Sequence, residues 1–349
     1  MKKAAIMTIN SLNFGNRLQN YALQKTIEQL GLKVSTIRRS HYVWDDNGVK
    51  EKIKDIIRYI VGSRKGAYLR FDRENIVFSR YRAEADTVDH GVEEKFDFFV
   101  TGSDQVWNPY YSHIVGKSDL LLFTKGAKRI SYAASFGVDS IPEEQKQTYA
   151  EALKEFRAIS VREKEAVKIV KELCGRDAAL TLDPTLLLTA DEWDHVARKP
   201  KAAPKGKYIL LYCIGDIPDH IKKELREYKN RTGCAVYNIL GTLKNGREVA
   251  AGPAEFLWLV KHAECVYTDS FHATVFSIIY RVKVRSFSRR GLDMSSRVRS
   301  LAEITGMHDH FDQKGVFFMT GEEDYAEIEK RLNLEKGHSI QYLKDALSQ

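Results

Sequence analysis

The order of predicted strands and helices is the feature of this chain that most restricts its fold. Short apolar runs, typical of buried strands, alternate with segments of helical periodicity, and the whole alternation occurs twice. Strands that are joined through helices pair in parallel, and the helices then cover the faces of the sheet. We therefore expect an α/β protein with two Rossmann-like domains that face a cleft.

The first half contains six expected strands and three clear helices. Gly31 ends the first of these helices, and a basic segment of helical character follows the second strand. The expected strands are Lys3–Ile9, Val34–Ile37, Phe96–Thr101, Ile130–Ala134, Ile159–Val161 and Ala179–Leu182. The expected helices are Arg17–Leu30, Glu143–Phe156 and Glu163–Leu173.

A linker separates the two halves. Residues 198–207 are rich in Pro and Lys and lack large apolar side chains. We expect an N-terminal domain over 1–197, the linker 198–207, a C-terminal domain over 208–320 and two helices within 321–349. The second half is expected to contain strands Tyr208–Cys213, Ala235–Ile239, Cys265–Thr268 and Lys283–Phe287, and helices Pro218–Thr232, Pro253–Ala263, His272–Tyr280 and Ser296–Thr305.

Length and composition indicate a soluble protein. The 349 residues favour two domains over one, and 43% hydrophobic residues suffice for two cores. No apolar run approaches 18 residues, and the N-terminal run stops at Asn10, too early for a signal peptide. The four cysteines are far apart and lie in or beside apolar segments, which predicts reduced core thiols in the cytoplasm and no metal site.

The net charge of +8 is concentrated in one segment. Between Lys50 and Arg82 there are ten Lys and Arg against four acids, and five aromatic residues are interleaved with them. Two explanations stay open: a helical surface whose aromatics face the core, or a peripheral contact with the inner face of the membrane. The motifs of the common nucleic-acid-binding folds are absent, so we expect no nucleic-acid partner.

Polar side chains follow several expected strands, at the sheet edge where open α/β proteins bind ligands. After the first strand, Gly15 permits a tight turn, and Asn16, Arg17 and Asn20 are suited to an anion or a sugar. The loop after the third strand supplies amides and a carboxylate for sugar hydroxyls and an indole face for a sugar ring. Its residues are Ser103, Asp104, Gln105, Trp107 and Asn108. The alternative for the second loop is a capped turn, although a turn gains nothing from an indole.

Two further positions indicate chemistry. His272 is expected in the first turn of a helix that follows a buried strand, where backbone N–H groups favour an anion and an imidazole can transfer a proton. The alternative is a partly buried polar residue beside a cap at Asp269 or Ser270. Arg162 also begins a helix, where a cation opposes the helix dipole. An anionic ligand or partner would explain Arg162, whereas Asp183-Pro184 is interpreted as structural.

These segments together resemble the bacterial polysaccharide pyruvyltransferase family. The resemblance extends from about residue 5 to about residue 310, and its more specific motifs are the Gly-Ser-Asp-Gln-x-Trp-Asn segment at 102–108 and the helix that carries His272. It implies a glycosyltransferase-B-like fold and transfer of the enolpyruvyl group of phosphoenolpyruvate onto two hydroxyls of a sugar. The implied product is a pyruvate ketal on a cell-surface polysaccharide or on its lipid-linked precursor.

The resemblance also implies roles for the residues. His272 and Asp104 would be catalytic. The acceptor sugar would bind in the N-terminal domain to Gly15, Asn16, Arg17, Asn20, Ser103, Gln105, Trp107 and Asn108. The donor, phosphoenolpyruvate, is a co-substrate, and neither a cofactor nor a metal is required. It would bind, mostly in the C-terminal domain, to Arg162, Ser270, Lys283, Arg285, Arg289, Arg290 and Arg297.

Ser270 departs from the family pattern. Family members often carry arginine two residues before the histidine, and this arginine is thought to hold phosphoenolpyruvate. Either Lys283, Arg289 or Arg290 replaces it here, or the chain uses another donor. The alternative functions are a nucleotide-sugar-dependent glycosyltransferase of the same fold and a non-catalytic, membrane-associated assembly factor. A nucleotide-sugar enzyme should show a glycine-rich pyrophosphate loop, and none follows Glu264 or Asp269.

Overall fold

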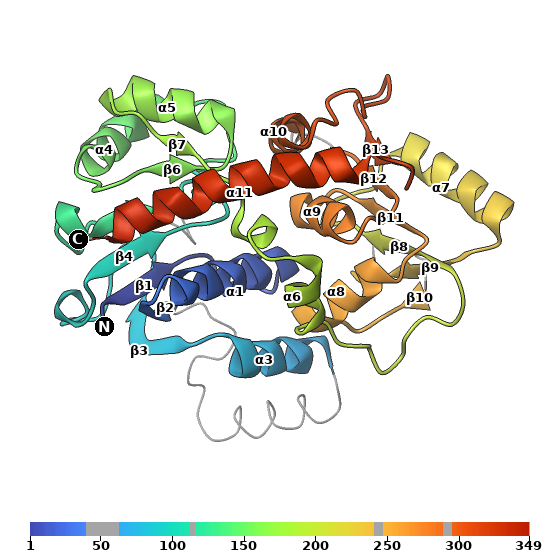
Figure 1. Ribbon diagram of the computed structural model, residues 1–349, viewed down its shortest axis with the longest axis horizontal. Helices are drawn as coiled ribbons and strands as arrows, with labels where there is room; N and C mark the ends of the chain where they lie inside the picture. Colours follow the sequence, from blue (N-terminus) through green and yellow to red (C-terminus); the bar gives the residue numbers. More distant parts are fainter. Residues whose placement is uncertain (40–62, 112–115, 241–246, 289–294, 349) are drawn as a thin grey trace. The chain divides into compact units, whose positions relative to one another are not determined.

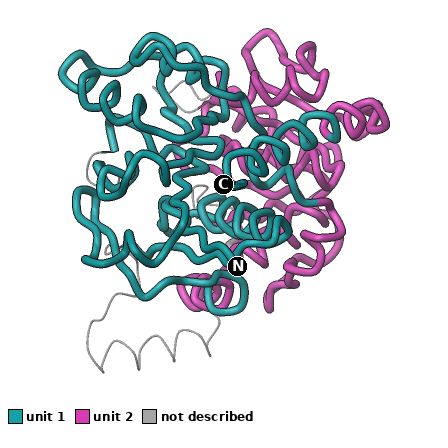
Figure 2. The backbone as a smooth tube through the Cα atoms, turned by 60° about the vertical axis from the view of Figure 1, so that its left-hand side comes forward, with its two compact units in different colours: residues 1–52, 72–188, 333–349 teal, residues 53–71, 189–332 magenta. Residues whose placement is uncertain are grey.

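The computed structural model describes residues 1–39, 63–111, 116–240, 247–288 and 295–348. It confirms the expected α/β class with parallel sheets (Figure 1). The chain forms two compact units: residues 1–52, 72–188 and 333–349 make unit 1, and residues 53–71 and 189–332 make unit 2 (Figure 2). The expected linker, 198–207, falls inside unit 2, and the C-terminal helix contributes to both units.

Unit 1 is built on a parallel five-stranded sheet of order β3-β2-β1-β4-β5. Ala5 and Met7 of β1 and Phe99 of β4 join a core that includes side chains of α4 and α5, and α1 lies over the sheet with Leu18 and Ala22 fully buried. The strands are β1 (Lys3–Met7), β2 (Lys33–Arg39), β3 (Phe78–Ala83), β4 (Phe98–Thr101) and β5 (Arg129–Ser131), and the helices are α1 (Phe14–Gln29), α4 (Glu143–Lys154) and α5 (Lys164–Cys174).

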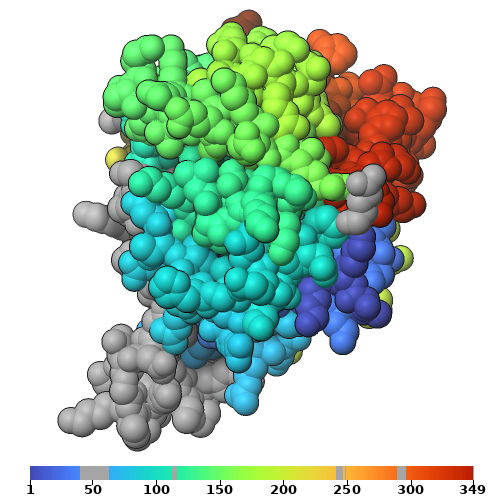
Figure 3. All heavy atoms as spheres, turned by 90° about the vertical axis from the view of Figure 1, so that its left-hand side faces the viewer, coloured from blue at the N-terminus to red at the C-terminus, as the bar shows by residue number. Residues whose placement is uncertain are grey.

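Two short strands, β6 (Ser160–Val161) and β7 (Ala179–Leu180), pair in parallel and continue the sheet through bridges from Ile130 to Ala158 and from Ala134 to Val161. Because of these bridges, the carboxyl ends of β1, β4, β5, β6 and β7 belong to one sheet system. On the side of the molecule drawn in Figure 3, the side chains of α4 and α5 and of the loops before them form a continuous layer of atoms.

Unit 2 contains a six-stranded sheet of order β10-β9-β8-β11-β12-β13, in which β13 pairs antiparallel with β12. Cys265 and Tyr267 pack toward Ile221 and Leu225 of α7, while Phe276 of α9 contacts α8. The strands are β8 (Tyr208–Tyr212), β9 (Ala235–Asn238), β10 (Arg247–Glu248), β11 (Cys265–Thr268), β12 (Val284–Ser286) and β13 (Phe317–Met319), and the helices are α6 (Ala190–Asp194), α7 (Asp219–Thr232), α8 (Pro253–Lys261), α9 (Phe271–Ile279) and α10 (Ser295–Thr305).

Three local expectations are wrong. The tail forms one helix, α11 (Tyr325–Leu347), and not two, because no proline interrupts it and Gly337 is accommodated within it. Its Tyr342 hydroxyl donates to the carbonyl of Ser131 at 2.8 Å. Residues 78–83 form strand β3, although they lie in the segment expected to be helical. The first helix begins at Phe14, three residues early, because the Asn13 side chain accepts a bond from the Gly15 N–H at 2.8 Å.

The basic segment between Lys50 and Arg82 is described only from residue 63 onward, as helix α3 (Arg64–Asn75) and strand β3. In α3 the aromatic side chains of Tyr68 and Phe71 are buried, and Arg70 forms an ion pair with Glu255 of unit 2. These two rings are therefore core residues. Lys50, Lys52, Lys54, Arg58 and Tyr59 lie outside the described residues, so the membrane contact stays a prediction. No helix in the described ranges is long and apolar enough to cross a bilayer.

Candidate active site

The loops after β1, β4, β5, β6 and β7 bring polar side chains together at the carboxyl edge of the unit 1 sheet. Two of these loops have unusual backbone conformations: Asp104 after β4 has φ of 71°, and Ala133 after β5 has φ of 47°. Such conformations persist only where the surroundings hold them, and they are concentrated at functional sites. Here the Ser135 N–H donates to the carbonyl of Asp104 at 3.0 Å, and the Trp107 N–H donates to the carbonyl of Ser135 at 3.2 Å.

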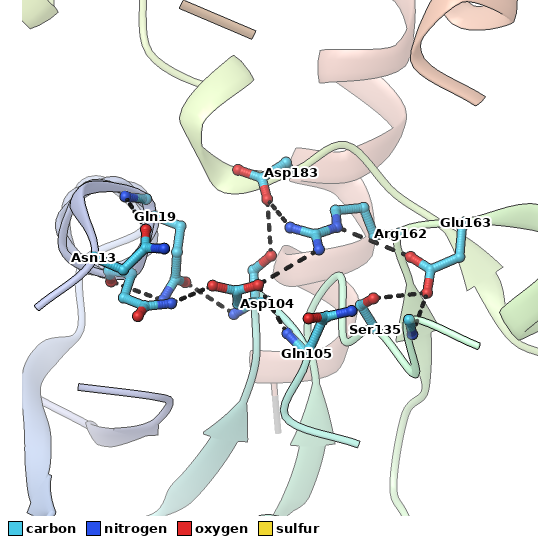
Figure 4. A network of polar contacts seen from close by, with 12 residues as sticks. Asn13, Gln19, Asp104, Gln105, Ser135, Arg162, Glu163 and Asp183 are labelled. Carbon is cyan, nitrogen blue, oxygen red and sulfur yellow. Dashed lines mark hydrogen bonds and ion pairs between the residues drawn. The ribbon is translucent and has the colours of Figure 1, made fainter. Parts of the chain in front are cut away.

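Arg162, which follows β6, lies among three carboxylates (Figure 4). Its Nη1 atom donates to Asp183 Oδ2 at 2.6 Å. Its Nη2 atom is 3.7 Å from Asp104 Oδ1, and its Nε atom is 3.9 Å from Glu163 Oε2. The side chains of Arg162 and Glu163 are nearly fully buried, while Asp104 is 9% exposed and is therefore the most accessible of the three acids.

Asp183 organises this cluster, although sequence reasoning treated it as structural. Its Oδ2 atom also accepts a bond from the Ser103 hydroxyl at 3.0 Å. Its Oδ1 atom accepts bonds from the Thr185 N–H at 3.0 Å and from the Thr185 hydroxyl at 2.6 Å. Asp183 thus joins the loop after β4 to the loop after β6. Its place directly after the expected strand 179–182 was the sequence signal that could have identified it.

The start of α1 supplies the other side of the cluster. The Asn16 amide donates to Asp104 Oδ2, and the Gln105 N–H donates to Asp104 Oδ1 at 2.9 Å. The Gln19 side chain accepts a bond from the Ser103 N–H at 3.0 Å. Asn16, Ser103 and Asp104 are therefore brought together, as the sequence predicted. Both carboxylate oxygens of Asp104 are oriented by these bonds.

The charge balance of the cluster favours hydroxyl groups over anions. One guanidinium faces three carboxylates, so the local charge is negative. Burial lowers the pKa of Arg162, but the carboxylates of Asp183, Asp104 and Glu163 outweigh burial and raise it. The protein carboxylates around this side chain account for its charge without an anionic ligand, and the role of Arg162 in donor binding stays a prediction. Carboxylates and amides are suitable acceptors and donors for sugar hydroxyls.

Three predicted acceptor residues have structural roles instead. Arg17 is fully buried, and its Nε atom donates to Asp72 at 2.8 Å. Asn20 is fully buried and accepts a bond from the Thr36 hydroxyl at 2.8 Å. The Trp107 indole is fully buried between Phe136 and Phe156 and donates to the carbonyl of Asp119 at 3.2 Å. Its ring cannot stack on a sugar, since the core of unit 1 covers it.

The remaining acceptor candidates lie beside the cluster. Gly15 is in the first turn of α1, where its N–H donates a hydrogen bond to the Asn13 side chain. The amides of Gln105 and Asn108 approach Gly137 so closely that a Cβ atom at this position would meet the Gln105 amide. Gly137 also has a φ of 65°, which favours glycine.

In unit 2, His272 lies where the sequence predicted, in the first turn of α9 after strand β11. Ser270 is the N-cap residue, and its N–H donates to the Thr268 hydroxyl at 3.0 Å. Asp269 accepts bonds from the N–H groups of Ile214 and Gly215, at 2.8 and 2.7 Å, and so connects α9 to the loop after β8. His272 is buried, and its ring packs edge-to-face with the ring of Phe271.

The predicted donor cations of unit 2 divide into three groups. Lys283 and Arg285 form ion pairs with Glu264 and Glu224, at 2.7 and 2.6 Å. They line a pocket of about 640 Å³ with residues of α7 and β13. Lys283 precedes β12 and is thus at the amino edge of the sheet, whereas His272 follows the carboxyl end of β11. The structure therefore does not bring Lys283 and Arg285 together with His272.

Arg297 of α10 is the described cation that lies near the His272 turn. Its guanidinium is above the ring of Phe271, 5.9 Å from the ring centroid, and its side chain is buried. Arg289 and Arg290 lie outside the described residues. Within the ranges that the structure describes, no group of three or more His, Cys, Asp or Glu side chains is arranged to hold a metal ion.

Comparison with known proteins gives a family and a fold. The family model described as polysaccharide pyruvyl transferase matches residues 13–291. No curated protein matches the sequence. A glycosyltransferase from Rickettsia africae is a similar solved structure, with a TM-score of 0.50, 11% identity and coverage of 99% of this chain and 98% of that chain. A UDP-GlcNAc 2-epimerase from Methanocaldococcus jannaschii has a TM-score of 0.47, 13% identity and coverage of 96% and 99%. The likeness to the glycosyltransferase confirms the fold.

Proposed function

The chain belongs to the polysaccharide pyruvyl transferase family, and on this premise we propose that it transfers the enolpyruvyl group of phosphoenolpyruvate to a sugar. Two hydroxyls of a cell-surface polysaccharide, or of its lipid-linked precursor, become bridged as a pyruvate ketal, and phosphate is released. The observation that carries the proposal is the cluster at the carboxyl edge of unit 1, where Asp104, Asn16 and Ser103 converge beside Arg162. We assign this cluster to the acceptor.

The reaction needs one proton donor and one proton acceptor. The methylene carbon of phosphoenolpyruvate gains a proton, and the first sugar hydroxyl attacks the neighbouring carbon and loses its proton. The bond from this carbon to the phosphate oxygen then breaks, and the second hydroxyl closes the ring while its proton leaves with the phosphate. We assign removal of the hydroxyl proton to Asp104, because it is oriented and the most accessible acid of the cluster.

The donor is assigned to the start of α9 in unit 2. His272 supplies the proton to the methylene carbon, and the N–H groups of the first helical turn favour an anion. Ser270 leaves this turn without the arginine that family members often have. Of the predicted cations in the described ranges, Arg297 is assigned to replace it, because its guanidinium lies above the ring of Phe271 in this same turn, whereas Lys283 lies at the amino edge of the sheet. A guanidinium can bind a carboxylate or a phosphate through two parallel hydrogen bonds.

The test is phosphate release from phosphoenolpyruvate, screened over free and lipid-linked galactose, glucose and mannosamine derivatives. Release that depends on one acceptor, with a ketal in the product, supports the proposal. The likeness to a glycosyltransferase fold keeps a second candidate, a nucleotide-sugar-dependent glycosyltransferase. Tight binding of a nucleotide sugar, with no binding of phosphoenolpyruvate, would favour this candidate instead.

We also propose that the basic segment from Lys50 to Arg82 holds the enzyme at the inner face of the membrane, where a lipid-linked acceptor is presented. Its net charge of +6 supports this, since each basic residue near an anionic surface contributes about 1 kcal/mol. Vesicles containing anionic lipid should bind the protein less as salt is added, and less again when Lys50, Lys52, Lys54 and Arg58 become Glu. Binding that is absent or independent of salt would contradict the proposal.

A further inference from the structure

Glu163 is buried in a way that its own hydrogen bonds do not explain. Its Oε1 atom accepts bonds from the Ser135 hydroxyl at 2.7 Å and from the Gly137 N–H at 3.4 Å. Its Oε2 atom is also buried, but has no hydrogen-bond partner among the described residues. Burial of a carboxylate oxygen without such a bond is costly. The nearest cationic atom that faces Oε2 is Nε of Arg162, 3.9 Å away.

The Arg162 guanidinium is shared among three acids, each on a different edge. The Nη1 atom of Arg162 donates to Asp183, its Nη2 atom faces Asp104 and its Nε atom faces Glu163. All three carboxylates favour the charged form of Arg162. Asp104 additionally contacts Asn16 of α1 and the Gln105 N–H, which are neutral. The negative charges of Asp183 and Glu163 therefore reduce the positive potential that Arg162 exerts at Asp104.

We infer that Glu163 is a positioning residue that, through Arg162, sets the electrostatic potential at Asp104 when this carboxylate accepts a proton from the acceptor hydroxyl. The inference rests on the proposed function, because it assigns this proton transfer to Asp104. Glu163 itself is too buried to touch a substrate. Its negative charge partly offsets that of Arg162 and so lowers the positive potential that the guanidinium exerts at the Asp104 carboxylate.

Glu163→Gln separates the charge from the packing. Glutamine has the same shape, its carbonyl oxygen can keep the bonds from Ser135 and Gly137, and its amide group replaces the Oε2 atom that has no hydrogen bond to lose. The expected result is that the acid limb of the pH profile of kcat/KM moves to lower pH by roughly half a unit or more, because less negative charge then surrounds Arg162. A residue that only maintains the fold would lower activity at all pH values without moving this limb.

Glu165→Gln is the matched control. Glu165 lies two residues later, in the first turn of α5, and this substitution removes the same negative charge. None of the ion pairs described above for Arg162 involves Glu165, so the pH profile of this variant should coincide with that of the wild type. Asp183→Asn is a second test, since it also removes a carboxylate from Arg162 and should move the acid limb in the same direction. Thermal unfolding of every variant shows whether it is folded.

The outcomes are distinguishable. If no sugar supports phosphate release by the wild-type enzyme, the proposed function fails. If the wild-type enzyme is active and the profiles of folded Glu163→Gln and Asp183→Asn coincide with its own, the inference is overturned alone. A shift of the acid limb to higher pH, or an equal shift in Glu165→Gln, would also overturn it.

Discussion

Asp183 and Arg162 form a buried ion pair in which Nη1 of the arginine lies 2.6 Å from Oδ2 of the aspartate, and the same oxygen accepts the hydroxyl of Ser103. One carboxylate therefore fixes the direction of a guanidinium from the end of β6 and of a loop from the end of β4. This geometry leaves Nη2 of Arg162 facing Asp104. The assignment of Asp104 as the group that takes a proton depends on it.

Asp104→Asn should lower kcat by roughly 10²- to 10⁴-fold, the usual contribution of a positioned base. The asparagine side chain cannot accept the hydroxyl proton, although it keeps the size of the aspartate. The measurement is the rate of acceptor-dependent phosphate release. Asp139→Asn, which changes an exposed carboxylate of the same unit, should retain wild-type kcat. Comparable rates for Asp104→Asn and the wild type would remove Asp104 from the mechanism.

Trp107→Phe should lower the free energy of unfolding without changing the apparent KM for the acceptor. The indole is packed against Phe136 and Phe156, so the smaller ring leaves a cavity and a loss of roughly 1–3 kcal/mol. Denaturant unfolding measures the first quantity, and initial rates over a range of acceptor concentrations measure the second. A raised KM with unchanged stability would restore the sugar-stacking role that the sequence suggested.

Arg297→Ala should raise the KM for phosphoenolpyruvate by about 10-fold or more, the effect of losing a charge-assisted hydrogen bond of roughly 1.5–3 kcal/mol. Arg297→Lys should restore only part of it, because lysine cannot form two parallel bonds. Arg281→Ala is the control, since this arginine is half-exposed and pairs with Glu329. Unchanged donor KM in folded Arg297→Ala would transfer the role to residues outside the described ranges, such as Arg289 or Arg290.

Asp119 predicts a pH effect on stability. Burial raises the pKa of Asp119 from 3.8 to about 6, although Arg39 opposes this. The folded state then binds more protons than the unfolded chain between these values, so this group's contribution to stability falls as pH rises from about 4 to 6, by roughly 3 kcal/mol. The difference in unfolding free energy between the wild type and Asp119→Asn should therefore shift in favour of the variant over this range. A difference that is constant with pH would show that the pKa is not raised.

Much of the fold could be predicted from sequence because its strands are short apolar runs between helices. The histidine-bearing turn was predicted correctly, since β11 and α9 are adjacent in sequence and their signals are local. Strand β3 was missed because Phe78 and Tyr81 lie among basic residues in a segment that resembles a helix surface. The antiparallel strand β13 was missed as well, because pairing with β12 depends on tertiary contacts.

The site was less predictable than the fold, for a physical reason. Arg162, Asp104 and Asp183 come from three strand ends far apart in sequence, so no local pattern indicates that they share one ion-pair cluster. Trp107 shows the opposite error: an aromatic residue in a polar loop suggested a sugar platform, but the loop turns this side chain into the core. Sequence gives the residue types at a sheet edge, whereas burial decides which of them can touch a substrate.

The most direct test of the central claim is the reaction in heavy water. With phosphoenolpyruvate and the acceptor that supports phosphate release, pyruvyl transfer predicts that each ketal methyl group gains a single deuterium from the solvent and that one phosphate is released per ketal. Nuclear magnetic resonance of the purified product measures both the ketal and its isotopic content. Phosphate release without a ketal, or transfer of a sugar from a nucleotide donor in place of the pyruvyl group, would contradict the account.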